Sequence, residues 1–107
     1  MKANNLVVIT GASEGIGFAL AKKFSQENFP MLLISRNIKK NAKVKKLIDK
    51  TVDKWGHIDV LVNSAGHGPR APILELTDED WHKGMDTYFM NVVRSTRLVT
   101  PIMQKQK

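Results

Sequence analysis

The chain contains no cysteine among its 107 residues, so it can form neither a disulfide framework nor a thiolate metal site. It also lacks a long apolar run. The first one, from Leu6 to Ile9, is too short for a signal-peptide core or a membrane span. Its three histidines share no metal-ligand spacing. We therefore expect a cytoplasmic protein without a metal site.

Acidic residues are few, ten against 17 lysines and arginines, which gives a formal net charge of +7. Such an excess is one mark of a nucleic-acid-binding surface. The lysines between residues 39 and 54, however, are interspersed with apolar residues at helical spacing, and no aromatic residue stands among them to stack on bases. The apolar residues are Val44, Leu47, Ile48, Val52 and Trp55. This pattern favours the solvated side of an amphipathic helix over nucleic-acid binding. Binding of a cofactor phosphate is a further alternative.

The most informative stretch combines an apolar strand, a glycine turn and a helix. The β-branched run Leu6–Ile9 is typical of a buried parallel strand, and Gly11, Gly15 and Gly17 follow it. The next apolar residues recur at helical spacing; they are Ile16, Ala19, Leu20 and Phe24. A helix N-terminus after such a turn can bind an anion, because its N–H groups are unpaired and glycines admit a pyrophosphate close to the backbone. A turn that serves packing alone is the alternative.

The rest of the chain predicts two more strands and two more helices. Apolar runs at 31–34 and 58–62 indicate buried strands, and helix ends are expected at Asn28 and Gly56, residues that tolerate a left-handed backbone. Thr77 is a candidate N-cap for a long last helix, which Pro101 is expected to kink or stop. The apolar side predicted for that helix consists of Trp81, Met85, Phe89, Val92, Val93 and Thr96.

Two motifs resemble one known family. The sequence T-G-A-S-E-G-I-G at 10–17 resembles the cofactor loop of short-chain dehydrogenases/reductases, and N-S-A-G at 63–66 is similar to their Asn-Asn-Ala-Gly motif. The resemblance implies an α/β, Rossmann-like, doubly wound parallel sheet. It also implies reversible hydride transfer between NAD(P)H and a small-molecule carbonyl or alcohol. About three strands are visible, so we expect residues 1–107 to form a single, partial NAD(P)-binding domain, with the second strand, the first and the 58–62 strand in that spatial order.

The resemblance assigns the cofactor contacts residue by residue. Those implied for the pyrophosphate are Thr10, Gly11, Ser13, Gly15, Ile16 and Gly17. Those implied for the adenine–ribose wall are Asn63, Ala65 and Gly66. At the end of the second strand, Ser35 repels no phosphate and Arg36 can clamp one, so NADP(H) is favoured over NAD(H), although Glu14 stands against this preference.

Three departures from the family pattern limit what the resemblance implies. The family's catalytic Tyr-x-x-x-Lys motif is absent, since the only tyrosine, Tyr88, is followed four residues later by Val92. Between Arg36 and Asn63 there is room for the lysine-rich helix and little else, whereas relatives place a further helix and strand there, so the resemblance implies the loss of a strand–helix unit. Counted from Trp81 to Pro101 without gaps, the position of the family's catalytic Asn falls on Tyr88, and Asn91 lies one turn later as a weak catalytic candidate.

These observations predict the cofactor-binding part of a truncated NADP(H)-dependent oxidoreductase that is not competent alone. A catalytically silent nucleotide-binding or interaction module is the alternative. The 78–103 helix resembles one through which relatives pair subunits, so we expect a homo-oligomer, no membrane association and no nucleic-acid partner. His67 borders the expected cofactor site, where an exposed loop histidine is favoured over a catalytic one.

Overall fold

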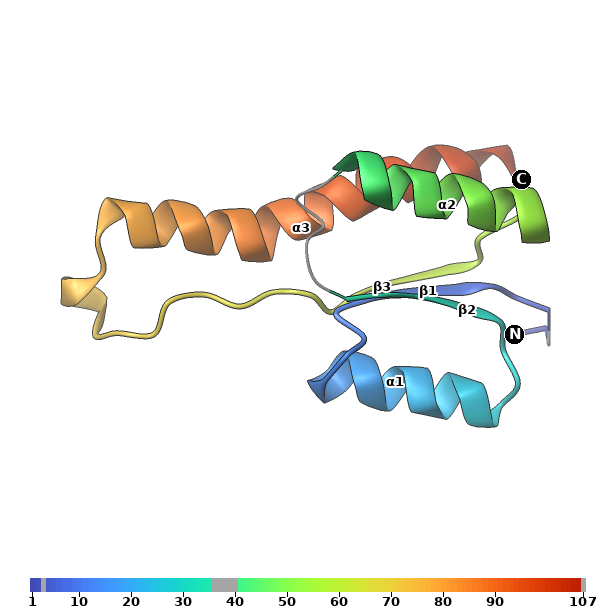
Figure 1. Ribbon diagram of the computed structural model, residues 1–107, viewed down its shortest axis with the longest axis horizontal. Helices are drawn as coiled ribbons and strands as arrows, with labels where there is room; N and C mark the ends of the chain where they lie inside the picture. The colour runs from blue at the N-terminus through green and yellow to red at the C-terminus, as the bar shows by residue number, and fades with distance from the viewer. Residues whose placement is uncertain (3, 36–40, 107) are drawn as a thin grey trace.

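The computed structural model describes residues 1–2, 4–35 and 41–106 of the chain. Its elements are β1 (Val7–Thr10), α1 (Gly15–Gln26), β2 (Met31–Ile34), α2 (Asn41–Trp55), β3 (Val60–Asn63), the single 3-10 turn η1 (Ile73–Glu75) and α3 (Asp78–Lys105). Figure 1 shows them as three layers, with the sheet between α1 on one side and α2 and α3 on the other.

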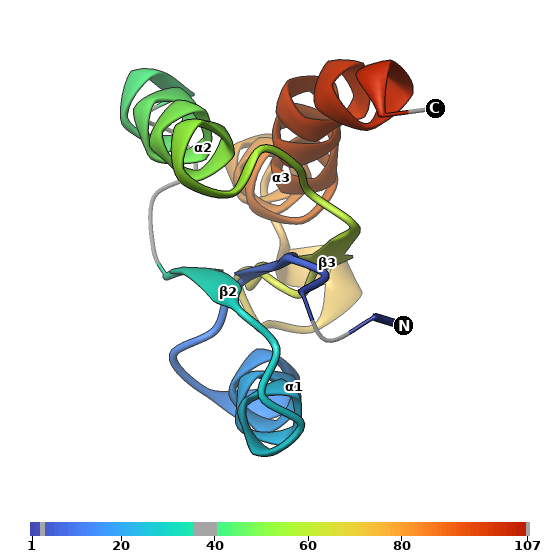
Figure 2. The same ribbon diagram turned by 90° about the vertical axis from the view of Figure 1, so that its right-hand side faces the viewer.

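The sheet is parallel throughout, and β1 is its central strand. The order β2-β1-β3 confirms the predicted α/β architecture, with Val7 opposite both Met31 and Val60. All four residues of β1 are buried, as expected for a strand covered on both faces. The chain crosses from β1 to β2 through α1 and from β2 to β3 through α2, on opposite faces of the sheet (Figure 2).

Alternation along β1 divides the core in two. Val7 and Ile9 pack in a cluster with Ala21 of α1, whereas Val8 packs in a second cluster with Ile48 of α2 and Val99 of α3. Successive strand side chains point to opposite faces, so one four-residue strand serves both helical layers.

The inner faces of α1 and α2 are largely the predicted ones and differ from them at their edges. Ile16 and Ala19 are exposed, and Gly17 and Ala21 are buried in their place. In α2 the buried residues include Thr51, whose hydroxyl bonds the carbonyl of Leu47, while Leu47 itself is exposed. The other apolar residues pack as predicted, Leu20 and Phe24 of α1 on one core cluster and Val44, Ile48 and Val52 of α2 on the other. The edges of the two faces differ because close packing favours small side chains beneath α1 and a hydroxyl can be buried once it is hydrogen-bonded.

The predicted helix ends are confirmed, with one exception. Asn28 (φ 62°) and Gly56 (φ 81°) adopt the left-handed backbone expected of them. Thr77 caps α3 in a reciprocal capping box with Asp80, and its hydrogen bonds lower the pKa of the Asp80 carboxyl. The exception is Pro101, expected to kink or stop α3: it lies inside the helix, which continues to Lys105.

Tertiary contacts at the C-terminal end of α3 offset the hydrogen bond that Pro101 cannot donate. Ile102 and Met103 pack against the core. The Gln106 amide accepts from the Ile58 N–H at 2.9 Å and donates to the Ile58 carbonyl at 2.9 Å. Ile58, predicted as the first residue of the third strand, is therefore satisfied by a side chain instead of the sheet, and β3 begins at Val60.

Asp59 ties the start of β3 to the start of β1. Its carboxylate accepts a hydrogen bond from the Leu6 N–H at 2.7 Å and pairs with His57. Partial burial raises the pKa of Asp59, but the hydrogen bonds from Leu6 and from neighbouring side chains outweigh it, so the pKa lies below its ordinary value.

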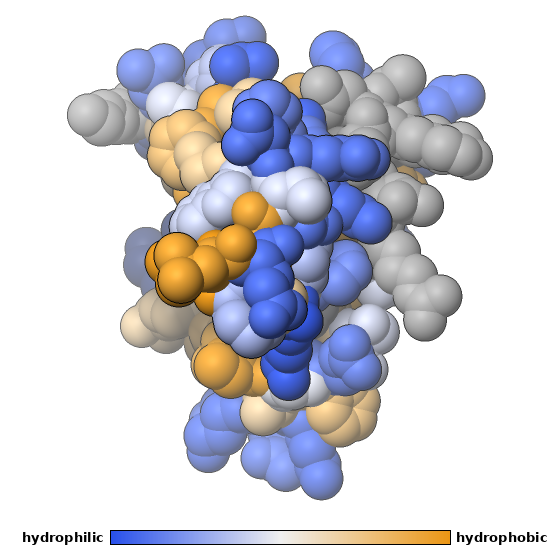
Figure 3. Space-filling model, turned by 90° about the vertical axis from the view of Figure 1, so that its left-hand side faces the viewer, coloured by the Kyte–Doolittle hydropathy of each residue, from blue (hydrophilic) through white to orange (hydrophobic). Residues whose placement is uncertain are grey.

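The two halves of α3 have different surroundings. Ser95 and Val99 in the second half are buried against the sheet. The first half extends beyond the sheet (Figure 1). Five of the six residues predicted for the apolar side of α3 are exposed: Trp81, Met85, Phe89, Val92 and Thr96. Apolar side chains also reach the surface at the end where α3 begins (Figure 3), where Ile73 and Leu74 are exposed. No helix in the described part of the chain is long and apolar enough to cross a membrane.

Candidate functional site

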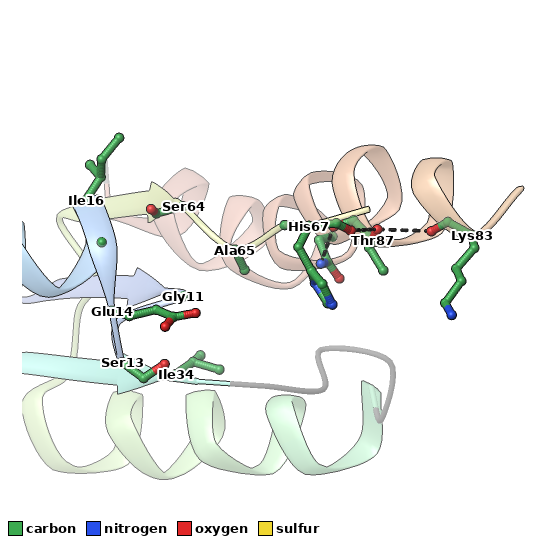
Figure 4. A pocket seen from close by; sticks show the side chains of 13 residues that line it. Gly11, Ser13, Glu14, Ile16, Ile34, Ser64, Ala65, His67, Lys83 and Thr87 are labelled. Carbon is green, nitrogen blue, oxygen red and sulfur yellow. Dashed lines mark hydrogen bonds between the residues drawn. The ribbon is translucent and has the colours of Figure 1, made fainter. Parts of the chain in front are cut away.

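A cleft of about 710 Å³ opens at the carboxyl ends of the strands. Figure 4 shows it between the turn after β1, the end of β2 and the first half of α3. Its lining residues are Gly11, Ser13, Glu14, Gly15, Ile16, Ile34, Ser64, Ala65, Gly66, His67, Lys83, Thr87 and Asn91. In open parallel sheets, ligands bind outside these strand ends, where the chain crossovers diverge to opposite faces.

The three glycines of the 10–17 motif have different surroundings. Gly11 (φ 64°) lies against the second motif so closely that a Cβ there would stand 2.7 Å from the Ala65 backbone. Gly17 is buried, and a Cβ on it would stand 2.2 Å from the Gly11 carbonyl oxygen. Gly15 (φ 60°) lines the cleft with no atom within 4 Å of its Cβ position. Gly11 and Gly17 thus permit packing, whereas Gly15 leaves space in the cleft.

The N-terminus of α1 faces this space. Glu14 is the N-cap residue, its backbone is extended, and its side chain makes no capping hydrogen bond. The first turn of α1 carries no acidic residue. The first N–H groups of a helix lack intrahelical partners and bear a partial positive charge. This wall of the cleft is therefore suited to an anion.

Thr10, which was predicted to contact the pyrophosphate, is buried and joins the two motifs. Its hydroxyl oxygen accepts hydrogen bonds from the N–H groups of Ser64 (3.1 Å) and Ala65 (3.3 Å) and donates to the Val62 carbonyl at 3.4 Å. Asn63 is likewise engaged behind the cleft, where its side-chain oxygen accepts a hydrogen bond from the Ser95 hydroxyl. Thr10, Asn63 and Gly17 do not line the cleft.

The other predicted contacts divide between the cleft wall and its surroundings. Seven of the predicted residues line the cleft: Gly11, Ser13, Gly15, Ile16, Ala65, Gly66 and Asn91. Ser35 is exposed and does not line it. Arg36 lies outside the described residues. The Asn91 amide donates to the carbonyl of Thr87, so this candidate catalytic group is already hydrogen-bonded within α3.

The far wall of the cleft includes residues that the sequence analysis did not select. Lys83 and Thr87 come from α3, and together with Asn91 they recur every fourth residue along one side of the helix. This polar stripe is a signal that could have been found by its spacing. The Thr87 hydroxyl donates to the carbonyl of His67, which fixes the loop after β3 to α3.

Tyr88 holds the same loop from the other side. Added Cβ atoms on Gly66 and Gly68 would lie 2.8 Å and 2.9 Å from the Tyr88 ring. The ring therefore occupies the space that side chains at these two positions would need. Tyr88 does not line the cleft, and its role in this structure is to pack the 66–68 loop.

Comparison with known proteins finds a matching family and similar relatives. The profile of the family described as short chain dehydrogenase matches residues 5–50 and 30–107. An uncharacterized oxidoreductase of Staphylococcus epidermidis is 31% identical over 122 aligned residues, which cover 94% of this chain and 53% of the relative. A 3-oxoacyl-acyl-carrier-protein reductase of Thermotoga maritima is 31% identical over 124 residues, covering 94% of this chain and 50% of the reductase.

Solved structures of dehydrogenases also superpose on this chain. The ligand-free aldohexose dehydrogenase of Thermoplasma acidophilum superposes with a TM-score of 0.83 at 26% identity, covering 94% of this chain and 44% of the dehydrogenase. The chain spans about half the length of the curated relatives that it matches. Their alignments are longer than the 107 residues of this chain, so the relatives carry residues within the aligned span that it lacks.

Proposed function

Because this chain belongs to the short chain dehydrogenase family, we propose that its cleft binds the dinucleotide of an NADP(H)-dependent oxidoreductase. The proposed reaction is hydride transfer between the cofactor and a small carbonyl or alcohol. The observation that carries the proposal is the conformation of Gly15. It has a left-handed backbone, open space at its Cβ position, and lies at the N-terminus of α1 on the cleft wall.

The pyrophosphate is proposed to lie against the turn of Gly11, Ser13 and Gly15. The unpaired N–H groups at the start of α1 would donate to its oxygens, and the partial positive charge of the helix end favours the anion. Three residues behind this wall support it through their contacts. Thr10 joins the two motifs, Gly17 packs α1 against Gly11, and Asn63 bonds Ser95 of α3.

The adenosine half is proposed to extend toward the end of β2, which carries Ser35 and, next in sequence, Arg36. A guanidinium–phosphate contact contributes roughly 1.5–3 kcal/mol when well formed. Calorimetry on the wild type should therefore give tighter binding of NADPH than of NADH, and Arg36→Ala should remove the difference. Equal affinities of the wild type for both cofactors would refute the preference for NADP(H).

The residues of this chain are proposed to bind and orient the cofactor, without supplying the proton. Reduction of a carbonyl needs a donor within hydrogen-bond reach of its oxygen. Tyr88 has no lysine four residues on, and its ring is packed against Gly66 and Gly68. This observation also favours a second candidate function, that of a catalytically silent nucleotide-binding module.

We further propose that the exposed side of α3 pairs with a second copy of the chain. Trp81, Met85, Phe89 and Val92 share this side and are exposed over the half of α3 that extends beyond the sheet. Apolar helix surface of this extent is usually covered in a folded protein or assembly.

The decisive experiment titrates the chain with NADPH and compares Gly15→Val with Gly56→Val. Both glycines have a left-handed backbone and open space around the Cβ position, but Gly56 is at the end of α2 and does not line the cleft. The two variants therefore carry the same backbone strain. Gly15→Val should lose NADPH binding while circular dichroism shows a folded chain, and Gly56→Val should keep it. Undiminished binding by a folded Gly15→Val chain would refute the proposed site.

A further inference from the structure

The end of the cleft farthest from the start of α1 carries two cationic or hydrogen-donating side chains. His67 enters from the loop after β3 and Lys83 from the second turn of α3, and Figure 4 shows both side chains directed into the same space. Glu14 and Ser13 lie on the opposite wall. The cleft therefore has two separate regions suited to anions, one at α1 and one at α3.

The position of His67 is fixed by its neighbours. Its carbonyl accepts a hydrogen bond from the Thr87 hydroxyl, and the Tyr88 ring fills the space beside Gly66 and Gly68 on either side of it. The hydrogen bond to the His67 carbonyl and the Tyr88 ring beside its two neighbours position the imidazole at the cleft wall.

Lys83 is available to a ligand. Within the described part of the chain its ammonium group takes part in no ion pair. Asp80 and Asp86 each lie three residues from Lys83 along the helix. Asp80 accepts the Thr77 N–H at 3.0 Å in the capping box, and the nearby Lys83 charge helps to lower its pKa, whereas the Asp86 carboxylate accepts a hydrogen bond from Arg94. Thr87 follows Lys83 by one turn and donates to the carbonyls of His67 and Lys83, which keeps this stretch of α3 beside the loop.

We propose that Lys83 and His67 form a second anion subsite, which holds the carboxylate or phosphate of an anionic carbonyl substrate. The inference rests on the proposed function, because it names the substrate class of the same cleft. The pyrophosphate is assigned to α1, the adenosine phosphate to the β2 side and the adenine–ribose wall to Ala65 and Gly66, so the end of the cleft at His67 and Lys83 remains for the reacting half of the cofactor and the substrate. An ammonium group and an imidazole N–H can together donate to two oxygens of one anion.

The test follows the ring resonances of His67 by NMR while inorganic phosphate is added to the full chain, first alone and then with saturating NADPH. Lys83→Met should weaken phosphate binding about tenfold, the loss expected for one charge-assisted hydrogen bond. Lys83→Arg should retain binding within about twofold, since it keeps the charge. Lys105→Met removes an equal charge from the end of the same helix, away from the cleft, and should leave binding unchanged.

Each outcome decides the proposal. Phosphate binding near His67 that persists with NADPH present, and that Lys83→Met weakens, supports a substrate subsite. Displacement of phosphate by NADPH, or loss of NADPH binding in Lys83→Met, would mean that these residues serve the cofactor's own phosphate and would overturn it. Equal binding by the wild type and Lys83→Met would also overturn it. If the wild type binds phosphate at His67 but no NADPH, the proposed function fails while the anion subsite stands.

Discussion

Removal of the Thr10 hydroxyl tests how the 64–66 segment is fixed to the end of β1. Thr10→Val keeps the shape of the side chain but removes the oxygen that accepts from the Ser64 and Ala65 N–H groups and donates to Val62. A net contribution of about 1 kcal/mol for each hydrogen bond, reduced by the long distances of 3.3 and 3.4 Å, gives a loss of roughly 1–3 kcal/mol in the free energy of unfolding.

Urea unfolding measures this loss directly. With a slope of about 1–2 kcal/mol per molar urea for a small domain, the midpoint should fall by about 1 M. The matched variant Thr10→Ser keeps the hydroxyl and removes a methyl group, so it should lose only about 1 kcal/mol and keep its NADPH affinity. Thr10→Val should bind NADPH more weakly, because the 64–66 segment is no longer fixed to β1. If Thr10→Val unfolds at the wild-type midpoint and binds NADPH equally well, the hydroxyl does not join the two motifs.

Four further outcomes are expected. Gly17→Ala should prevent stable folding, since its Cβ would stand 2.2 Å from the Gly11 carbonyl oxygen, and circular dichroism would detect the loss. The pKa of Asp59 lies below its ordinary value, so its carboxylate stabilises the fold above about pH 3.9, the pKa of an unfolded aspartate, and this stabilisation is lost as the pH falls through the lower folded pKa. Urea midpoints between pH 6 and pH 3 should therefore decline less in Asp59→Asn than in the wild type. Light scattering should find a dimer or larger species that Phe89→Glu dissociates, and a wild-type monomer at high concentration would contradict the pairing of α3. The purified chain should show no carbonyl reduction, and turnover that Gly15→Val abolishes would refute that expectation.

The elements of the fold could be predicted from the sequence because their signals are local. Apolar runs indicated the three strands, left-handed residues at Asn28 and Gly56 ended two helices, and Thr77 began the third. The loop of Gly11 and Gly15 at the cleft was also predictable, since its glycines need positive φ within a strand–turn–helix unit. Each of these features depends on residues only a few positions apart.

Features that depend on neighbours distant in sequence were decided by tertiary structure alone. The periodicity of α1 could not show that Ile16 faces solvent, because Gly17 approaches the Gly11 carbonyl only once the loop has folded back. Pro101 remains helical because contacts with the core and the pairing of Gln106 with Ile58 hold the end of α3.

The cleft itself shows the same division. The wall proposed to bind an anion could be predicted from the sequence, because the turn and the helix N-terminus that form it are continuous in the chain. The sequence analysis assigned Thr10 to that wall, whereas folding placed the Thr10 hydroxyl behind it, on N–H groups more than fifty residues away. The opposite wall is lined by His67 and Lys83 together, which requires α3 to lie beside the loop after β3. No local pattern encodes that contact, since it is produced by packing of α3 against the sheet.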